Sequence, residues 1–162
     1  MTSPRRLPET QRAFRIGDPE GRFPVWSPEG ARRVAGRWHE TGAAVIYACE
    51  TYAAAMLEKL VQWNGVFPDN QHFVEIGIPR GASYEVATTD TVPGWDNRDC
   101  VASRLFGTAW FEEQRSTILF VPSIVARMER NLVINSLHPE FRDIQVSLER
   151  PVWWDRRLFQ PI

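Results

Sequence analysis

The chain has 162 residues, enough for one domain with a buried core. Hydrophobic residues make up 43% of it and charged residues 24%, as in an ordinary globular protein. With 19 basic and 20 acidic side chains the net charge is −1, so no overall field favours nucleic acid or an anionic membrane. We therefore expect no direct nucleic-acid binding and no membrane association.

The cysteines and the apolar stretches exclude several further classes. Cys49 and Cys100 are the only cysteines and neither lies in a CxxC pair, so we expect no disulfide framework and no metal site. The three histidines stand in unrelated contexts. The N-terminus lacks the apolar core of a signal peptide, and the longest apolar stretch, 118–126, is too short to span a bilayer. We expect a cytoplasmic protein with reduced thiols.

The first part of the chain predicts two strands. We expect residues 1–11 to be a loose leader and residues 12–162 to form a single domain. Residues 13–16 predict a short strand, and a loop rich in proline and glycine covers 17–29. Residues 43–48 are apolar, β-branched and aromatic, which predicts a buried strand.

A helix is predicted after the second strand. Thr51 can cap it, and the helical pattern runs to about Trp63. Glu58 lies at the edge of the apolar stripe, one turn after Ala54, which leaves room for a ligand against the helix. The expected apolar face consists of Ala53, Met56, Leu57 and Leu60.

The second half is rich in predicted strands. One helix is expected over 98–113, interrupted at Gly107. Strands outnumber helices and do not alternate with them, which favours an α+β fold over a doubly wound parallel sheet. We expect central mixed or antiparallel strands with flanking helices. The predicted strands are 73–78, 84–88, 117–122, 132–135 and 144–148.

Two arginines are candidates for an anion site. The sequence has no GxGxxG after a strand, no P-loop, no HExxH and no GxSxG, so a bound nucleotide would need a non-Rossmann site. Arg37 follows Gly36, and its guanidinium suits bidentate contact with phosphate; a surface arginine stacked on Trp38 is the alternative. Arg15 lies within a predicted strand, where an outward side chain on an edge strand is the alternative.

Five further positions carry polar groups that suit a pocket. Tyr47 can present its ring to a flat heterocycle, or fill the core. Glu58 can stabilise a cationic, oxocarbenium-like transition state, or be a solvated residue at a helix edge. Ser123 follows a strand, where it suits a pocket rim or a turn. Asn131 and Asn135 flank a short apolar strand and can bind either backbone or ligand.

Taken in order, these segments resemble the RES-domain family, the toxin halves of bacterial RES–Xre toxin–antitoxin pairs. The resemblance implies a fold like that of ADP-ribosyltransferases and an activity that consumes NAD⁺ without a prosthetic group. It implies catalytic roles for Arg37, Glu58 and Ser123, and contacts to NAD⁺ from Arg15, Arg37, Tyr47, Ser123 and Asn135. The matching segments are 14–16, 36–38, 45–47, 55–58, 121–123, 131–135, 138–139 and 155–158.

One residue departs from the family pattern. The family usually has asparagine after Gly-Arg-Trp, whereas this chain has His39. The exchange is expected to alter hydrogen bonding in this loop or substrate preference without removing the pocket.

The resemblance implies a toxin that cleaves the nicotinamide–ribose bond of NAD⁺ and causes growth arrest. Water as acceptor gives a glycohydrolase, phosphate a phosphorylase and a protein side chain an ADP-ribosyltransferase; the sequence does not choose among them.

A cognate Xre-type antitoxin is expected to cover the pocket in an oligomeric complex. A non-catalytic module that binds a nucleotide or a protein is the alternative from another class. A nucleic-acid-directed toxin is disfavoured by the balanced charge.

Overall fold

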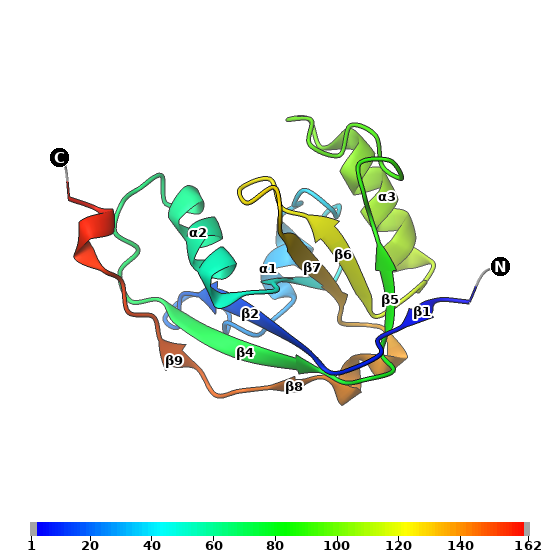
Figure 1. Cartoon of the computed structure of the whole chain (residues 1–162), viewed down its shortest axis with the longest axis horizontal. Coiled ribbons are helices and arrows are strands. Elements are labelled where there is room, and N and C mark those ends of the chain that lie inside the picture. The colour runs from blue at the N-terminus through cyan, green and yellow to red at the C-terminus, as the bar shows by residue number, and fades with distance from the viewer. Residues whose placement is uncertain (1–2, 161–162) are drawn as a thin grey trace.

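A single mixed β-sheet with helices packed against it forms the body of the computed structural model, which describes residues 3–160 (Figure 1). The helices are α1 (Glu29–Arg33), α2 (Tyr52–Gln62) and α3 (Val101–Glu112), with 3₁₀ turns η1 (Pro139–Asp143) and η2 (Arg156–Leu158). The strands are β1 (Arg5–Arg6), β2 (Gln11–Gly17), β3 (Val45–Cys49), β4 (His72–Ile78), β5 (Ser83–Val86), β6 (Ile118–Pro122), β7 (Arg130–Asn135), β8 (Gln145–Val146) and β9 (Arg150–Pro151).

The strand order confirms the α+β class. It runs β1-β5-β6-β7-β3-β2-β4-β8, and β9 pairs with β4. Neighbouring strands are antiparallel except β5 and β6, which are parallel. The sheet bends strongly, so that β2 and β4 run below β6 and β7 in the view of Figure 1. The strands do not alternate with helices as in a doubly wound fold.

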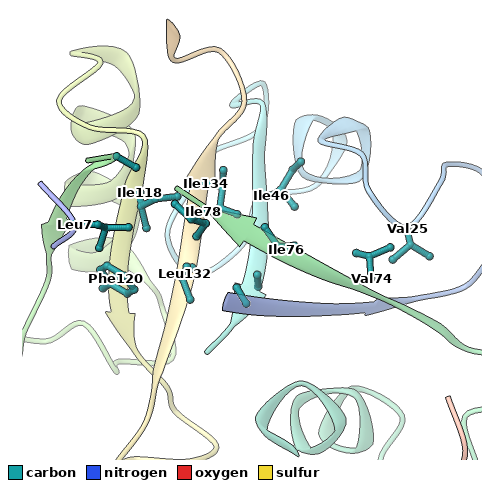
Figure 2. Close-up of a cluster of buried hydrophobic side chains, with 13 residues drawn as sticks. Leu7, Val25, Ile46, Val74, Ile76, Ile78, Ile118, Phe120, Leu132 and Ile134 are labelled. Atoms are coloured by element: carbon teal, nitrogen blue, oxygen red, sulfur yellow. The ribbon is translucent and has the colours of Figure 1, made fainter. Parts of the chain in front are cut away.

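Both faces of the central strands are buried. Successive side chains of a strand point to opposite faces, so each strand contributes residues to both buried layers. Ile46 and Ile134 face the inside of the bend, where residues of β2 and β4 meet them (Figure 2). Val45 and Leu119 face the other side and pack with Trp110 of α3. The central strands therefore read as continuous apolar runs in the sequence.

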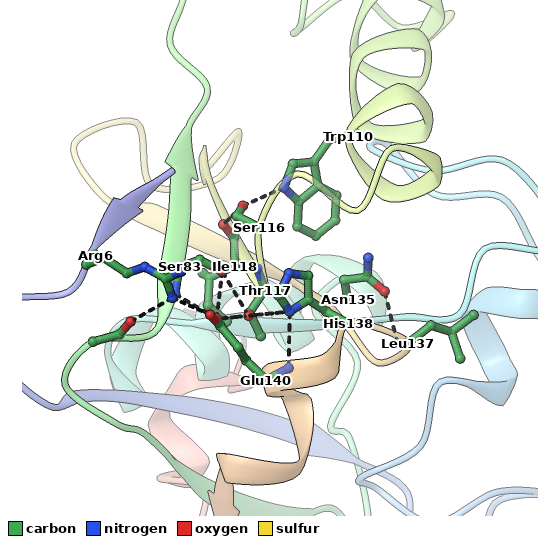
Figure 3. Close-up of polar contacts among 11 residues, drawn as sticks. Arg6, Ser83, Trp110, Ser116, Thr117, Ile118, Asn135, Leu137, His138 and Glu140 are labelled. Carbon is green, nitrogen blue, oxygen red and sulfur yellow. Dashed lines mark hydrogen bonds and ion pairs between the residues drawn. The ribbon is translucent and has the colours of Figure 1, made fainter. Parts of the chain in front are cut away.

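A partly buried polar cluster fastens η1 to one end of the sheet (Figure 3). Glu140 Oε2 accepts hydrogen bonds from Ser83 Oγ (2.7 Å), Ser83 N (2.9 Å) and Thr117 Oγ1 (2.5 Å), and its other oxygen pairs with Arg6. His138 Nδ1 lies 2.9 Å from Thr117 Oγ1. Partial burial acts to raise the pKa of Glu140, but these donors outweigh it and lower the pKa to about 2. We call these five residues the Glu140 cluster.

The predicted leader is part of the fold. Arg5 and Arg6 pair with β5, Leu7 is buried, and β2 already begins at Gln11. The prediction of a loose segment is therefore wrong for these residues, while residues 1–2 lie outside the described part. A single leucine between arginines and a proline carries no periodic pattern, so the sequence did not reveal that it fills the core.

Other differences concern short or tightly packed elements. Helix α3 runs through Gly107 without interruption, so the prediction of a break is wrong. The glycine is needed for close packing, because a Cβ at this position would lie 1.8 Å from the carbonyl oxygen of Trp38. The strand predicted over 144–148 shortens to β8, and α1, β1 and β9 were not predicted. No helix within residues 3–160 is long and apolar enough to cross a membrane.

Candidate functional site

Helix α2 brings Glu58 to the sheet. Its N-cap is Thr51, whose side-chain oxygen accepts a hydrogen bond from the backbone N–H of Ala54 (3.1 Å), as predicted. Ala54 and Ala55 are buried against the sheet in a cluster with Ile16. Glu58 follows these alanines by four and three residues, so it lies on the same inner face of the helix.

The inner face of α2 is only partly the one that hydrophobicity predicted. Met56 packs against the buried Ala54 and Ala55, as expected, but Ala53 and Leu57 are exposed. Small side chains let the helix approach β2 and β3 closely, and a polar residue is accepted beside them because it finds hydrogen-bond donors on the sheet. Glu58 therefore lies within the inner face of the helix rather than at its edge.

Two neighbouring strands supply those donors. Glu58 Oε1 accepts hydrogen bonds from Ser123 Oγ (3.0 Å) and Asn131 Nδ2 (2.8 Å). Ser123 directly follows β6 and is 1% exposed, while Asn131 pairs with Val121 of that strand. Among residues 3–160, neither Glu58 Oε2 nor the buried Asn131 Oδ1 has a side-chain hydrogen-bond partner. We call Glu58, Ser123 and Asn131 the Glu58 cluster.

Two cavities meet at this cluster. One has a volume of about 300 Å³ and lies against β2, β3 and α2; the other, of about 330 Å³, lies beside the Gly36–Trp38 turn and the end of β6. Both are lined by Tyr47, Glu58, Gln62 and Asn131. Glu58 therefore lies where a ligand spanning both cavities would pass.

The first cavity contains two cations. Arg15 donates to the carbonyl oxygens of Val25 (Nε, 2.6 Å) and Tyr47 (Nη1, 3.0 Å), which fixes the guanidinium. Burial lowers its pKa, although a guanidinium stays charged in proteins. Lys59 lines the same cavity, and burial followed by repulsion from Arg15 lowers the pKa of its amine. Neither cation forms an ion pair with a carboxylate of the described residues, so this cavity suits an anion.

The second cavity contains Arg37. Its Nη1 donates to the carbonyl oxygens of Trp95 (3.0 Å) and Asn97 (2.9 Å). These bonds use one nitrogen and leave the rest of the fork for an anionic ligand. Trp38 is turned into the core, where it stacks on Trp95 with ring centroids 6.1 Å apart. The alternative of a surface arginine stacked on Trp38 therefore does not describe this turn.

Tyr47 forms the wall between the cavities. Its hydroxyl oxygen accepts a hydrogen bond from the Trp38 N–H (3.1 Å) and lies 2.7 Å from Nδ1 of His39. Burial raises the pKa of the phenol, so it remains protonated. His39, the residue that departs from the family pattern, is thus in direct contact with a residue of the pocket.

The site has no thiolate nucleophile. Cys49 lines the first cavity, but burial, and then the charge of Glu58, raise the pKa of its thiol to about 12. Within residues 3–160 no three His, Cys, Asp or Glu side chains are grouped as metal ligands. The groups available for chemistry are therefore a carboxylate, fixed cations, amides and a phenol.

Asn135 is the one predicted site residue that the structure does not bring here. It lies at the other end of β7, where Nδ2 donates to Phe111 O (3.4 Å) and Oδ1 accepts from Leu137 N (3.0 Å). It lines neither cavity, and its bonds explain its burial. Asn131 takes its place at the site, because the strand register sets it beside the end of β6.

The other predicted residues come together although they span more than a hundred positions of the chain. Sequence reasoning missed Lys59 and Gln62 as lining residues. Gln62 follows Glu58 by one helical turn, and this spacing is the signal that could have found it. The residues gathered around the two cavities and the Glu58 cluster are Arg15, Arg37, Tyr47, Glu58 and Ser123.

Comparison with protein families gives a match over most of the chain. The model described as "RES domain" matches residues 12–155. A protein of Sphingobium sp. (strain YBL2), named "Prs ADP-ribosylating toxin", is 40% identical over 139 residues, which cover 83% of this chain and 86% of that protein. A protein of Yersinia enterocolitica, named "Toxin Res", is 31% identical over 128 residues, covering 77% of this chain and 84% of that protein.

A solved structure has the same fold. It is a chain of the M. tuberculosis MbcT–MbcA toxin–antitoxin complex, with a TM-score of 0.71 at 16% sequence identity. The alignment covers 91% of this chain and 86% of that one. At this identity the likeness concerns the fold, and it agrees with the mixed sheet and few helices described above.

Proposed function

Since the chain belongs to the RES-domain family, we propose that it is the toxin of a toxin–antitoxin pair and breaks the bond between nicotinamide and ribose in NAD⁺. The observation that carries this proposal is the Glu58 carboxylate. One oxygen is held by Ser123 and Asn131, the other accepts no hydrogen bond from residues 3–160, and the glutamate lines both cavities that contain the fixed cations.

The chemistry of this bond suits the groups present. Nicotinamide is cationic while attached and leaves as a neutral molecule, so its departure needs no general acid. The charge that develops lies on the ribose, and a fixed carboxylate stabilises such an oxocarbenium-like centre. Glu58 supplies that charge, and its open oxygen can accept a hydrogen bond from a ribose hydroxyl.

The remaining residues have positioning roles in this proposal. Arg15 and Arg37 bind the pyrophosphate, and Tyr47 packs on the nicotinamide ring. Ser123 is 1% exposed and already donates to Glu58, so it acts by holding the carboxylate rather than by contacting the ribose. Asn131 holds the carboxylate from the other strand, and its unpartnered Oδ1 can accept a hydrogen bond from the substrate.

The acceptor of the ADP-ribosyl group distinguishes two candidates. Water or phosphate would make the protein a glycohydrolase or a phosphorylase. Transfer to a protein is favoured by the relative from Sphingobium, which is 40% identical and is named for ADP-ribosylating Prs. Prs is therefore the first protein acceptor to test. An Xre-type antitoxin that covers the two cavities in an oligomeric complex is the proposed partner.

The test is NAD⁺ consumption by the purified protein freed of antitoxin, alone, with phosphate, and with purified Prs. Release of ADP-ribose, or of its 1″-phosphate when phosphate is present, would identify a small acceptor. Labelled Prs would identify the transferase. Glu58→Gln should abolish each of these outcomes. A folded sample that consumes no NAD⁺ under any condition would overturn the proposal in favour of a binding module.

A further inference from the structure

His39 is a buried histidine whose two ring nitrogens both have partners. Its side chain is 2% exposed. Nε2 lies 2.8 Å from the carbonyl oxygen of Ala31 and 2.9 Å from that of Val34, and Nδ1 lies 2.7 Å from the hydroxyl oxygen of Tyr47. The imidazole therefore bridges the end of α1 and the wall between the two cavities.

These contacts determine the tautomer of the ring. Two carbonyl oxygens can only accept, so Nε2 must carry the hydrogen. No carboxylate of the described residues is hydrogen-bonded to the ring. In the neutral ring Nδ1 is then an acceptor, and the Tyr47 hydroxyl donates to it.

The consequence is a fixed phenol. Tyr47 accepts from the Trp38 N–H and donates to His39, so its hydrogen points away from the cavities and only a lone pair remains for a ligand. Gly36 packs closely against both side chains and leaves them little room to move, because a Cβ on Gly36 would lie 2.8 Å from both His39 Cε1 and the Tyr47 oxygen. The ring of Tyr47 is held in one orientation beside Glu58.

We infer that His39 is a positioning residue for NAD⁺ cleavage, and that it acts by holding the hydroxyl of Tyr47 as a hydrogen-bond acceptor toward the substrate. The inference rests on the proposed function. It explains what the departure from the family's asparagine does in this chain: the Nδ1 of histidine and the Oδ1 of asparagine can both accept the phenol hydrogen, while Nε2 adds an anchor to α1.

The test compares two substitutions at one position. His39→Leu removes the acceptor, and we expect a roughly tenfold loss of kcat, the scale of one hydrogen bond lost at a buried polar group. The KM for NAD⁺ should change by less than about twofold, because the Tyr47 ring remains in the cavity. His39→Asn keeps an acceptor and should retain turnover to within about threefold. His72→Leu, on a half-exposed histidine of β4, is the matched control and should leave turnover unchanged.

A double-mutant cycle separates this role from general damage. In a Tyr47→Phe background His39→Leu should have no further effect on kcat, because the group through which it acts is gone. Equal losses in both backgrounds, or wild-type turnover of His39→Leu, would overturn the inference. A wild-type protein that consumes no NAD⁺ would instead refute the proposed function.

An independent readout does not require activity. Nitrogen NMR of the three histidines should show one buried, neutral ring protonated at Nε2, whose signal disappears in His39→Leu. In Tyr47→Phe the Nδ1 resonance of that ring should shift, because it loses its donor. A ring protonated at Nδ1, or a charged ring at neutral pH, would overturn the assignment of roles.

Discussion

The Glu58 cluster and the Glu140 cluster lie at opposite ends of the same pair of strands. Ser123 follows β6 and donates to Glu58, whereas Thr117 precedes β6 and donates to Glu140. Both carboxylates thus receive a hydroxyl hydrogen bond from a residue next to the same strand. The two sites look alike in their local chemistry.

The two carboxylates differ in how many of their oxygens have hydrogen-bond donors. Glu140 has donors on both oxygens and lines neither cavity, so its charge stabilises the packing of η1 against the sheet. Glu58 has both donors on one oxygen, and it lines both cavities. A carboxylate whose two oxygens both have donors stabilises the fold, while a carboxylate with one free oxygen beside a cavity can take part in chemistry.

The largest expected effect comes from removing the charge at the open carboxylate. Glu58→Gln should lower NAD⁺ turnover by roughly a thousandfold, because the developing positive charge loses its counter-charge. The free energy of unfolding should stay within about 1 kcal/mol of wild type, since the amide oxygen can still accept from Ser123 and Asn131. Steady-state kinetics and denaturant unfolding check both statements. Turnover within tenfold of wild type would remove Glu58 from the catalytic role.

The same substitution in the other cluster should have the opposite pattern. Glu140→Gln should lower the free energy of unfolding by about 2 kcal/mol, because buried donors on Ser83 and Thr117 lose a charged acceptor. NAD⁺ turnover per folded molecule should not change. Urea unfolding followed by tryptophan fluorescence measures the first effect. A loss of turnover without a loss of stability would show that the Glu140 cluster contributes to catalysis rather than to the stability of the fold.

The two asparagines of β7 provide a matched pair at the two ends of one strand. Asn131→Ala should lower turnover roughly tenfold, because Glu58 loses one of its two donors. Asn135→Ala should lower the melting temperature and leave the KM for NAD⁺ unchanged, since its bonds are to backbone groups. Both variants are measured by the same kinetic and thermal assays. Equal effects on kinetics would restore Asn135 as a substrate contact.

The smallest expected effect is the change in the free energy of unfolding at acidic pH. The pKa of Glu140 is lowered to about 2, so its contribution to stability is complete above the ordinary glutamate value and is lost as the pH falls toward 2. The difference in unfolding free energy between wild type and Glu140→Gln should therefore shrink by at least about 1 kcal/mol between pH 6 and pH 3. Unfolding curves at these two pH values test it. A constant difference would mean that the cluster does not stabilise the ionised form.

Local patterns in the sequence were sufficient for most of the elements. Strands β3, β4, β6 and β7 and helix α2 carry apolar runs, β-branched residues or a capping threonine, and each was predicted within a few residues. Short elements such as β1 and β9 have two residues and no periodicity, so they were not predicted. Gly107 shows the limit of local reasoning, because the reason for a glycine there is the backbone of Trp38.

The residue types available for a site could be read from the chain alone: two arginines, a tyrosine, a glutamate and a serine in short, recognisable contexts. Which of these residues meet depends on the folded structure. Strand register chose Asn131 over Asn135, the small alanines of α2 turned Glu58 inward, and the turn after Arg37 placed His39 against Tyr47. The physical reason is that hydrogen bonds between residues far apart in the chain depend on pairing and close packing, and neither leaves a periodic trace in the sequence.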